Sequence, residues 1–584
     1  WPEAGYGVAP KDLKYRFQWT FPITISPHDH NTVYVGSQFV HKTTNGGQSW
    51  TLISPDLSTN DSTKQQSSGG VVIDNLFVEN VTVLFAIAES PLVKDLIWAG
   101  TMDGLLHITR DGGKSWTNVT ANMPGLPKWS TMSAIEPSKY DAGTAYVAVD
   151  AHLINDRDPY IYKTTDFGKT WTKLGSDIPK SVFSYVHVVR EDPVRKGMLY
   201  AGTENGLYVS LDDGAHFTEI NGSLPHAPVS WLQIQGHFHD LVVATYGRGF
   251  WIADDISYLR SLSDSLLTKR AALLPLRAAY RFRKIATPTG PTNSLVGGED
   301  PPLAATINFA ISEMPKDSTA RDSVRFRVYD ASGATIRTFA SAPPQRGLNR
   351  ALWDLRHNGP RKAKLRTAPP GNTNVRVLDS RPLVPWDLDL VGGQVGPLVA
   401  PGTYAVAMIW GRDTLRQSLE VRRDPNSEGT DADIVAQVTL ALRIRDALSE
   451  TVALMDESEW SRRGFEQLRS MLREKIKDAK EFGPSPGRDP KLADAEAFLK
   501  DIDAVEKRVI AIESKLYDIT LTGAREDAFR TPNQLYEKLA SVGSDVAASS
   551  ADFRPTDQQG AVYGMLRTQL DTLKGQFGQL VANE

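Results

Sequence analysis

The 584-residue sequence contains no cysteine. This absence excludes disulfides, thiolate metal sites and cysteine nucleophiles together. It does not fix the compartment, because a chain without cysteine tolerates both oxidising and reducing surroundings. Long hydrophobic runs are also missing: the stretch 83–88 is among the longest, far below the roughly 18 residues that span a bilayer. We therefore predict no transmembrane segment.

The sequence also has no large excess of positive or negative residues. The 65 basic and 69 acidic residues give a net charge of −4, so we expect no general attraction for nucleic acid. A hydrophobic content of 41% and a charged content of 23% exclude a mainly disordered or fibrous chain. The first residue is Trp1, and no basic-plus-apolar signal segment follows it. We expect either a mature product or a piece of a longer protein.

Composition changes along the chain and predicts three domains. Short alternating runs with many Gly and Trp residues indicate a β domain over 1–260. Residues 275–425 are rich in Pro, Val and Arg and indicate a second β region. From residue 430 onward, Ala, Leu, Glu, Lys and Arg at helical spacing indicate a helical domain over 430–584.

One unit recurs in the first domain. A Tyr-Val-Gly-Thr-like strand leads to a third strand and then to a turn of the form Ser/Thr-x-Asp-x-Gly-x-Ser/Thr-Trp. The closing aromatics are 66, 55 and 46 residues apart, which fits four-stranded blades with loops of variable length. A fifth unit, 241–252, lacks the final Trp. An alternating strand is also evident upstream of four of the units, at 21–26, 131–136, 185–190 and 231–235. The sequence predicts a β-propeller of about five blades.

The repeated turn has a mechanical interpretation. Its Asp accepts hydrogen bonds from amides of its own turn, its Gly takes the positive-φ position, and its aromatic packs between blades. We predict structural roles for the turn residues Asn45, Asp111, Asp166 and Asp212 and for the closing aromatics Trp50, Trp116, Trp171 and Phe217.

This turn resembles the Asp-box of bacterial neuraminidase repeats. The chain is similar to sialidases, xyloglucan hydrolases, the plant photosystem II stability/assembly factor and sortilin-type receptors, and most of all to secreted bacterial proteins labelled glycosyl hydrolase or sortilin-like. The resemblance covers most of residues 1–425 and is carried by 12–23, 26–34, 189–197, 244–255, 347–356 and 401–404. It implies export, as a secreted, periplasmic or cell-surface-associated protein. It also implies further Asp-box repeats upstream, so that this chain would be the C-terminal part of a longer protein, and it brings no well-defined activity.

Propeller geometry places the loops between second and third strands opposite the Asp-box turns. These loops carry Gln38, Asp103, Asp150, Glu204 and Tyr246-Gly-Arg248. Asp103 and Glu204 are the candidate carboxylate pair of a glycoside hydrolase, which needs two such groups across the scissile bond. We expect Arg248 to clamp an anion, Tyr246 to stack or act as an acid, and Gln38 and Asp150 to bind ligand. Equally, an acidic residue before Gly is ordinary turn chemistry.

Other chemistry is not indicated. The histidines at 28–30 and 237–239 lack zinc-ligand spacing, so we predict no metal. We find no Walker A loop, Gly-x-Ser-x-Gly elbow or His-Glu-x-x-His motif, and predict no cofactor. A sialidase needs an arginine cluster, and Arg248 is the one arginine in these loops.

The second β region predicts an immunoglobulin-like sandwich. It contains two hairpins, at 324–339 and 402–421, with a long loop near 360–400. Helices are expected at 431–448, 459–481, 489–519, 532–547 and 556–581, forming an antiparallel bundle. Arg473, Lys475 and Lys477 are expected on a solvated face.

Two functions remain open. The favoured one is an exported binding and scaffolding propeller that contacts a protein or glycan partner, or the upstream half of the same protein. The alternative is a glycan-directed glycoside hydrolase that uses Asp103 and Glu204. The five units could close into a ring or continue into upstream blades.

Overall fold

The computed structural model describes residues 5–283, 300–314, 324–372, 374–381, 383, 395–483, 492–522, 531–547 and 551–583. They form two compact units, Trp1–Leu262 and Ser263–Glu584, which are described separately. In the part of the chain that the structure describes, no helix is both long and apolar enough to cross a membrane.

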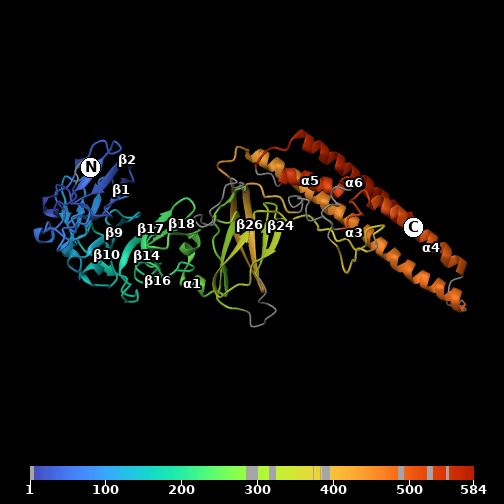
Figure 1. The fold of residues 1–584 in the computed structure, drawn as a ribbon, viewed down its shortest axis with the longest axis horizontal. Coiled ribbons are helices and arrows are strands. Elements are labelled where there is room, and N and C mark those ends of the chain that lie inside the picture. The colour runs from blue at the N-terminus through green and yellow to red at the C-terminus, as the bar shows by residue number, and fades with distance from the viewer. Residues whose placement is uncertain are drawn as a thin grey trace. The chain divides into compact units, whose positions relative to one another are not determined.

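The first unit consists of five antiparallel sheets in chain order (Figure 1). The first two contain β1 (Ile23–Ser26), β2 (Asp29–Gly36), β3 (Val40–Thr43) and β4 (Thr51–Leu52), then β5 (Leu84–Glu89), β6 (Ile97–Thr101), β7 (Leu106–Thr109) and β8 (Thr117–Asn118). The third and fourth contain β9 (Thr131–Pro137), β10 (Ala145–Asp150), β11 (Tyr160–Thr164) and β12 (Thr172–Leu174), then β13 (Val186–Glu191), β14 (Leu199–Thr203), β15 (Leu207–Ser210) and β16 (Thr218–Glu219). The fifth has three strands, β17 (Val229–Gln235), β18 (Asp240–Thr245) and β19 (Phe250–Ala253). These sheets are consistent with propeller blades and correspond to the five predicted repeats.

The Asp-box turns join third and fourth strands. In the second sheet, Asp111 Oδ1 accepts hydrogen bonds from the Thr109 hydroxyl (2.8 Å) and the Ser115 amide (3.0 Å). Mainly because of the hydrogen bonds from Ser115, the pKa of Asp111 is lowered to about 2. Asn45, Asp166 and Asp212 accept the equivalent amide hydrogen bonds in the first, third and fourth sheets.

The closing aromatics pack toward the preceding sheet. Trp116 Nε1 donates to the carbonyl of Ile53, and Trp171 lies edge-on to Trp98 with ring centroids 5.9 Å apart. Both Trp98 and Trp171 belong to a buried cluster between the second and third sheets. The sequence therefore stacks neighbouring sheets through one aromatic per repeat.

The second unit begins with the short helix α1 (Asp264–Leu267) and two sheets that share one apolar core. One sheet has the order β20–β22–β25 and the other β21–β27–β26–β23–β24. Their bounds are β20 (Ala271–Leu273), β21 (Ala279–Arg281), β22 (Ala305–Ile311), β23 (Arg325–Tyr329), β24 (Thr335–Ala340), β25 (Gly347–Trp353), β26 (Gly402–Trp410) and β27 (Asp413–Arg423). Both predicted hairpins are present, as β23–β24 and β26–β27.

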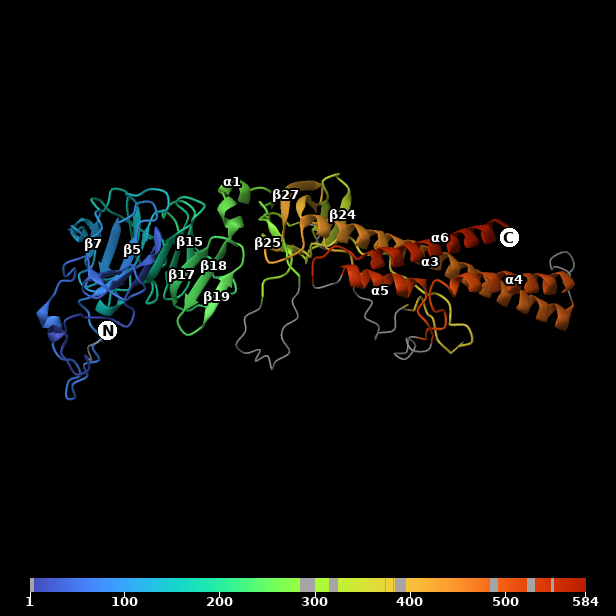
Figure 2. The same cartoon turned by 90° about the horizontal axis from the view of Figure 1, so that it is seen from above.

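Four helices follow among the described residues and lie side by side in both views (Figures 1 and 2). They are α3 (Asp431–Phe482), α4 (Leu492–Glu513), α5 (Leu535–Ala547) and α6 (Asp557–Asn583). The prediction of separate helices at 431–448 and 459–481 was wrong, since both belong to α3. The intervening residues contain no Gly or Pro, and Val452, Leu454 and Met455 are buried in the helical core. Residues 489–491 of the third predicted helix lie outside the described residues.

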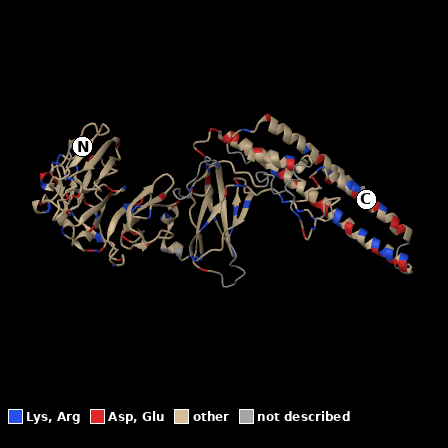
Figure 3. Cartoon of the chain, viewed as in Figure 1, with Lys and Arg blue, Asp and Glu red and all other residues tan. Residues whose placement is uncertain are grey.

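Charged side chains of both signs are scattered along these helices (Figure 3). Arg473, Lys475 and Lys477 are exposed near the end of α3. Ion pairs between neighbouring helices include Arg469 with Asp503 and Lys480 with Glu496. The mixed pattern forms no continuous basic stripe on the described helices.

A buried polar cluster fixes the described residues of the segment 361–383, part of the predicted long loop, onto the helices. Glu459 of α3 accepts hydrogen bonds from the Thr367 amide (2.7 Å), the Arg366 amide and the Tyr517 hydroxyl (2.7 Å). Arg462 lies 3.1 Å from Glu513. Leu365 and Leu383 of the same segment join the helical core. The described part of this loop is therefore packed against α3.

The stability of the helical region is expected to fall as the pH rises. Burial raises the pKa of Glu513 from 4.5 to about 7, and the nearby Glu459 carboxylate also raises it, whereas Arg462 lowers it. A carboxyl group whose pKa is higher in the folded protein than in the unfolded chain stabilises the folded state fully at pH values below its unfolded pKa. This stabilisation is lost as the pH rises through the folded pKa of about 7. Urea unfolding followed by the helical circular dichroism signal should therefore show lower stability at about pH 8 than at about pH 5. Glu513→Gln should flatten this dependence, and an unchanged dependence would contradict the assignment.

Candidate functional site

One end of the strands in the first unit gathers two sets of loops. Because antiparallel strands reverse direction, the loops between second and third strands and those leading to the next sheet lie at the same end. The first set is 37–39, 102–105, 151–159, 204–206 and 246–249, and the second is 53–83, 119–130, 175–185 and 220–228. We call this end the loop face. All the residues predicted for catalysis or ligand binding lie in or beside the first set.

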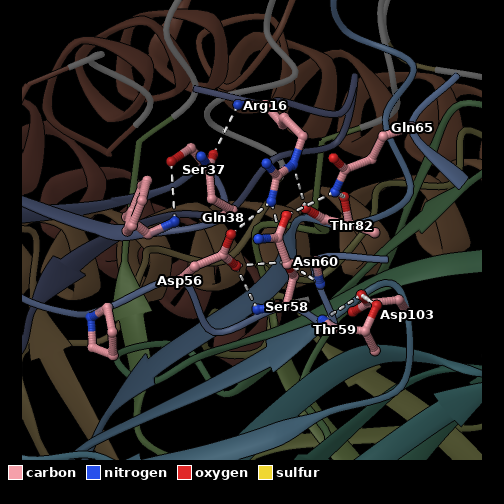
Figure 4. Close-up of polar contacts among 12 residues, drawn as sticks. Arg16, Ser37, Gln38, Asp56, Ser58, Thr59, Asn60, Gln65, Thr82 and Asp103 are labelled. Carbon is pink, nitrogen blue, oxygen red and sulfur yellow. Dashed lines mark hydrogen bonds and ion pairs between the residues drawn. The ribbon is translucent and has the colours of Figure 1, made fainter. Parts of the chain in front are cut away.

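Gln38 and Asp103 are part of a polar network beneath the long loop 53–83 (Figure 4). Gln38 accepts a hydrogen bond from the Arg16 amide (2.8 Å) and donates to the Lys14 carbonyl (3.0 Å). Arg16 also donates to Asp56 (2.8 Å) and to the Thr82 carbonyl (3.1 Å). The network ties the chain before β1 and the loop 53–83 to the first two sheets.

Asp103 is only 3% exposed. One carboxylate oxygen accepts from both the amide (2.8 Å) and the hydroxyl (2.6 Å) of Thr59. Burial raises the pKa of Asp103, while hydrogen bonds from Thr101 and Thr59 lower it. The carboxylate is thus buried and bonded to Thr59, so the geometry gives Asp103 an anchoring role.

Glu204 lies in a different cluster, between the third and fourth sheets. His187 Nε2 is 2.8 Å from Glu204 Oε2, and His187 Nδ1 is 3.6 Å from Asp150 Oδ2. Asp150 also lies 2.7 Å from Nδ1 of His152, whose ring stacks on Tyr185. The structure therefore brings Asp150 and Glu204 together across the His187 imidazole. Among the described residues, no hydrogen bond or ion pair joins Asp103 to Glu204.

Sequence reasoning missed His187. The pairing of β13 with β14 skips it, because Val186 pairs with Thr203 and Val188 with Gly202. An extra residue of this kind forms a β-bulge, which redirects its side chain. The inner strands of the second, third and fifth sheets carry Phe85, Ser133 and Ser230 at the matching skipped position. The sequence did contain a signal for His187: it is a histidine at a position where these three sheets carry Phe or Ser.

The remaining predicted residues belong to the fifth sheet. Tyr246 and Arg248 are both exposed in the loop 246–249, and the Arg248 carbonyl accepts from Trp251 Nε1 (3.0 Å). The described residues contain no group of three or more His, Asp or Glu side chains that could hold a metal ion.

Exposed apolar side chains lie on the two loops that carry His152 and Tyr185, the stacked rings beside Asp150. Leu153 and Ile154 lie in the loop 151–159, and Val182 and Phe183 lie in the loop 175–185. We call these four residues the apolar patch. Arg157 donates to the Val182 carbonyl (3.2 Å) and Ser184 donates to the Arg157 carbonyl (2.7 Å), so the two loops hold each other. The patch is therefore presented on a pre-ordered surface.

The anchoring role of Asp103 gives an expected result. Asp103→Ala leaves both Thr59 donors without their acceptor, and we expect the first unit to lose about 1–3 kcal/mol of stability. Asp103→Asn retains one acceptor oxygen and should lose less. Limited proteolysis should cut within 53–83 faster in the alanine variant. Unchanged digestion would contradict the anchoring role.

Comparisons with known proteins bear on the fold. No protein-family model matches the chain. A vacuolar protein sorting/targeting protein 10 from Laccaria bicolor is 30% identical over 108 residues, covering 18% of this chain and 6% of that protein. The match adds to the five antiparallel sheets and their repeated turns, which are consistent with propeller blades. A xyloglucanase from Hypocrea jecorina is 25% identical over 242 residues, covering 37% of this chain and 27% of that enzyme. The chain thus spans about a quarter or less of these relatives.

Two solved structures show the same distant similarity. The GH74 xyloglucanase of Xanthomonas campestris has a TM-score of 0.30 at 17% identity, with 44% of this chain and 40% of that chain covered. YCF48 bound to D1 peptide has a TM-score of 0.28 at 16% identity, with 42% and 66% covered.

Proposed function

We propose that the first unit is an exported protein-binding and scaffolding module that holds its partner on the loop face. The observation that carries this proposal is the apolar patch, four exposed apolar side chains on two loops that hold each other by hydrogen bonds. Exposed apolar side chains grouped on neighbouring loops are typical of interaction sites. The two hydrogen bonds between these loops lower the entropy cost of ordering them on binding.

The neighbouring charges indicate the kind of partner. The Asp150 and Glu204 carboxylates flank His187 beside the patch. Two carboxylates carry more negative charge than one imidazole can balance, so they favour a cationic group nearby. We therefore propose a protein segment that places an apolar anchor on the patch and a Lys or Arg next to it. One relative is a vacuolar protein sorting/targeting protein, which agrees with a protein partner.

The second unit supports a scaffolding role in this proposal. We propose that its two sheets form an immunoglobulin-like sandwich and that the helices attach the module to a periplasmic or cell-surface assembly. The shared core of the two sheets and the mixed charges on the helices support this role.

A glycan-directed hydrolase is the second candidate, favoured by the similarity to a xyloglucanase and by the approach of Asp150 and Glu204. Glycosidases hold their two carboxyl groups about 5–9.5 Å apart, with the substrate or water between them. Here the His187 ring lies between the two groups, and Asp103 is held by Thr59. Both observations count against this candidate.

Substitutions in the patch test the proposal. We expect a peptide selected from a library of extended peptides to bind the wild-type chain and to bind Phe183→Ser about tenfold more weakly, a loss of about 1.4 kcal/mol. Leu153→Ser should weaken binding similarly, because both side chains are exposed and can change without disturbing the core. Isothermal titration gives the affinities, and thermal unfolding shows whether the variants remain folded.

Val194→Ser is the matched control, since Val194 is an exposed apolar residue between β13 and β14, at the opposite end of the strands. It should bind like the wild type. Equal losses in all three variants would contradict a role for the patch. Cleavage of xyloglucan oligosaccharides that Glu204→Gln abolishes, together with no peptide binding, would favour the hydrolase.

A further inference from the structure

The second half of α3 uses one of its faces to pack on α4. Arg469, Leu472 and Ile476 follow each other at helical spacing and share this face. Arg469 pairs with Asp503 and Glu506 of α4, so the face is turned toward α4. Leu472 and Ile476 are accordingly buried. These residues account for the contact between the two helices.

A second apolar row lies on another side of the same helix. Trp460, Gly464, Leu468 and Met471 are spaced by four, four and three residues, which places them on one face, roughly a third of a turn from the face toward α4. The three larger side chains are 56%, 39% and 48% exposed. We call these four residues the α3 stripe. Apolar residues at this spacing are typical of a helix that packs on another helix.

The aromatic ring at one end of the α3 stripe is held in place. The guanidinium groups of Arg366 and Arg463 lie 4.7 and 5.7 Å from the centroid of the Trp460 ring. Arg366 is fixed in turn by an ion pair with Asp456 (2.8 Å). These cation–π contacts orient the indole and leave more than half of it exposed. Trp460 is therefore a pre-oriented anchor, which lowers the entropy cost of a contact made through it.

The glycine of the α3 stripe forms a hollow. Gly464 lies within α3, where glycine destabilises a helix relative to alanine. A Cβ atom at this position would meet no atom within 4 Å, so no contact among the described residues excludes a side chain there. A glycine on an exposed helix face allows a second helix to approach closely and to place a larger side chain over the gap.

Opposite charges flank the α3 stripe. Glu457 is exposed about one turn before Trp460, and Lys475 is exposed about one turn after Met471. Their spacing from the stripe puts both charges on its side of the helix. A parallel second helix of the same sequence would place like charges together at each end. An antiparallel one would place a carboxylate beside an ammonium group at both ends, so the charges favour the antiparallel orientation.

We infer that the α3 stripe is the contact surface for a second copy of this chain, with the two α3 helices antiparallel. Centred near position 466, this arrangement places Trp460 against the second copy's Met471, and Gly464 against the second copy's Leu468. Two-fold symmetry repeats each contact, so the stripe is complementary to itself. The two flanking charges meet their opposites in the same register. This inference does not depend on the function proposed for the loop face.

The size of the α3 stripe sets the strength of the contact. A stable interface involves about 20–30 residues on each side, far more than the stripe and its flanking charges provide. We therefore expect a weak dimer with a dissociation constant on the order of 10–100 µM.

The first test measures association of the 584-residue chain. Sedimentation equilibrium over about 1–300 µM should show an average mass that rises from monomer toward dimer. Met471→Asp should weaken association at least about tenfold, because it places a charge within the apolar contact. Val435→Asp is the matched control, since Val435 is an exposed apolar residue of α3 outside the stripe, and should associate like the wild type. Circular dichroism shows whether the variants remain folded.

Exchange of the flanking charges tests the register. Glu457→Lys places like charges together at both ends of the contact and should weaken association about tenfold. The double variant with Lys475→Glu restores opposite charges and should recover most of this loss. A merely structural effect of either substitution on α3 would not be reversed by the other.

The absence of cysteine allows the orientation to be tested by cross-linking, because an introduced thiol is the only one. Gln467→Cys lies near the centre of the contact, and Asp478→Cys lies further along the same side of α3; both positions are exposed. At about 1.5 Å per residue, antiparallel copies hold the two 478 positions about 36 Å apart and the two 467 positions close together. A bismaleimide that spans about 8–10 Å, the usual distance between packed helices, should link only the 467 variant into dimers.

Four results would overturn the inference. The first is a wild-type chain that stays monomeric over the whole concentration range, which would leave the stripe to a different partner. The second is a dimer that Met471→Asp does not weaken. The third is a double charge variant that associates no better than Glu457→Lys. The fourth is equal cross-linking at positions 467 and 478, which would indicate parallel helices.

Discussion

Glu459→Ala is expected to lower the free energy of unfolding of the second unit by about 3–5 kcal/mol. Glu459 is fully buried and accepts hydrogen bonds from the backbone of 366–367 and from the Tyr517 hydroxyl. Removal of the Glu459 side chain leaves these donors without an acceptor. It also leaves the buried Arg462 guanidinium with one carboxylate partner, Glu513, instead of two. Equilibrium denaturation followed by the helical signal measures the loss.

The control is on the same helix. Glu457→Ala removes an exposed carboxylate two residues away and should change stability by less than about 0.5 kcal/mol. Because Glu459 fixes the segment 361–383, the alanine variant should also be cut faster by protease within that segment. A Glu459→Ala variant as stable as Glu457→Ala would show that the polar cluster does not hold the segment.

Trp171→Ala should cost the first unit about 3–5 kcal/mol, because it removes a buried indole that packs on Trp98 between two sheets. Trp50 occupies the same place in the first repeat but is half exposed. Trp50→Ala should therefore cost less than about 1 kcal/mol in the 584-residue chain. Thermal unfolding of the two variants compares their losses of stability. Equal losses would contradict the assignment that Trp171 packs between two sheets and Trp50 does not.

The repeats were predictable because their information is local. An Asp-box turn contains its own hydrogen-bond acceptor, glycine and closing aromatic within eight residues, so four sheets could be placed from those turns. The upstream strand β5 was harder to see, because both its faces are buried and its sequence is a continuous apolar run instead of an alternating one.

The sites were less predictable, because they depend on contacts between distant residues. Asp103 was predicted from its loop as one of two catalytic carboxylates, but its partner is Thr59, which lies in the loop 53–83, 44 residues earlier in the chain. His187 reaches Asp150 and Glu204 through a β-bulge, and a bulge depends on strand register. The continuity of α3 also depends on core packing, which the sequence shows only weakly.

Hydrogen exchange of the intact chain with and without a selected peptide tests the central claim, that the loop face binds protein. Binding should slow exchange in the loops 151–159 and 175–185, which carry the apolar patch, and leave the loop 192–198 at the other end of the strands unchanged. Protection confined to the loop 246–249 or to the helices, with none at the patch, would contradict the account.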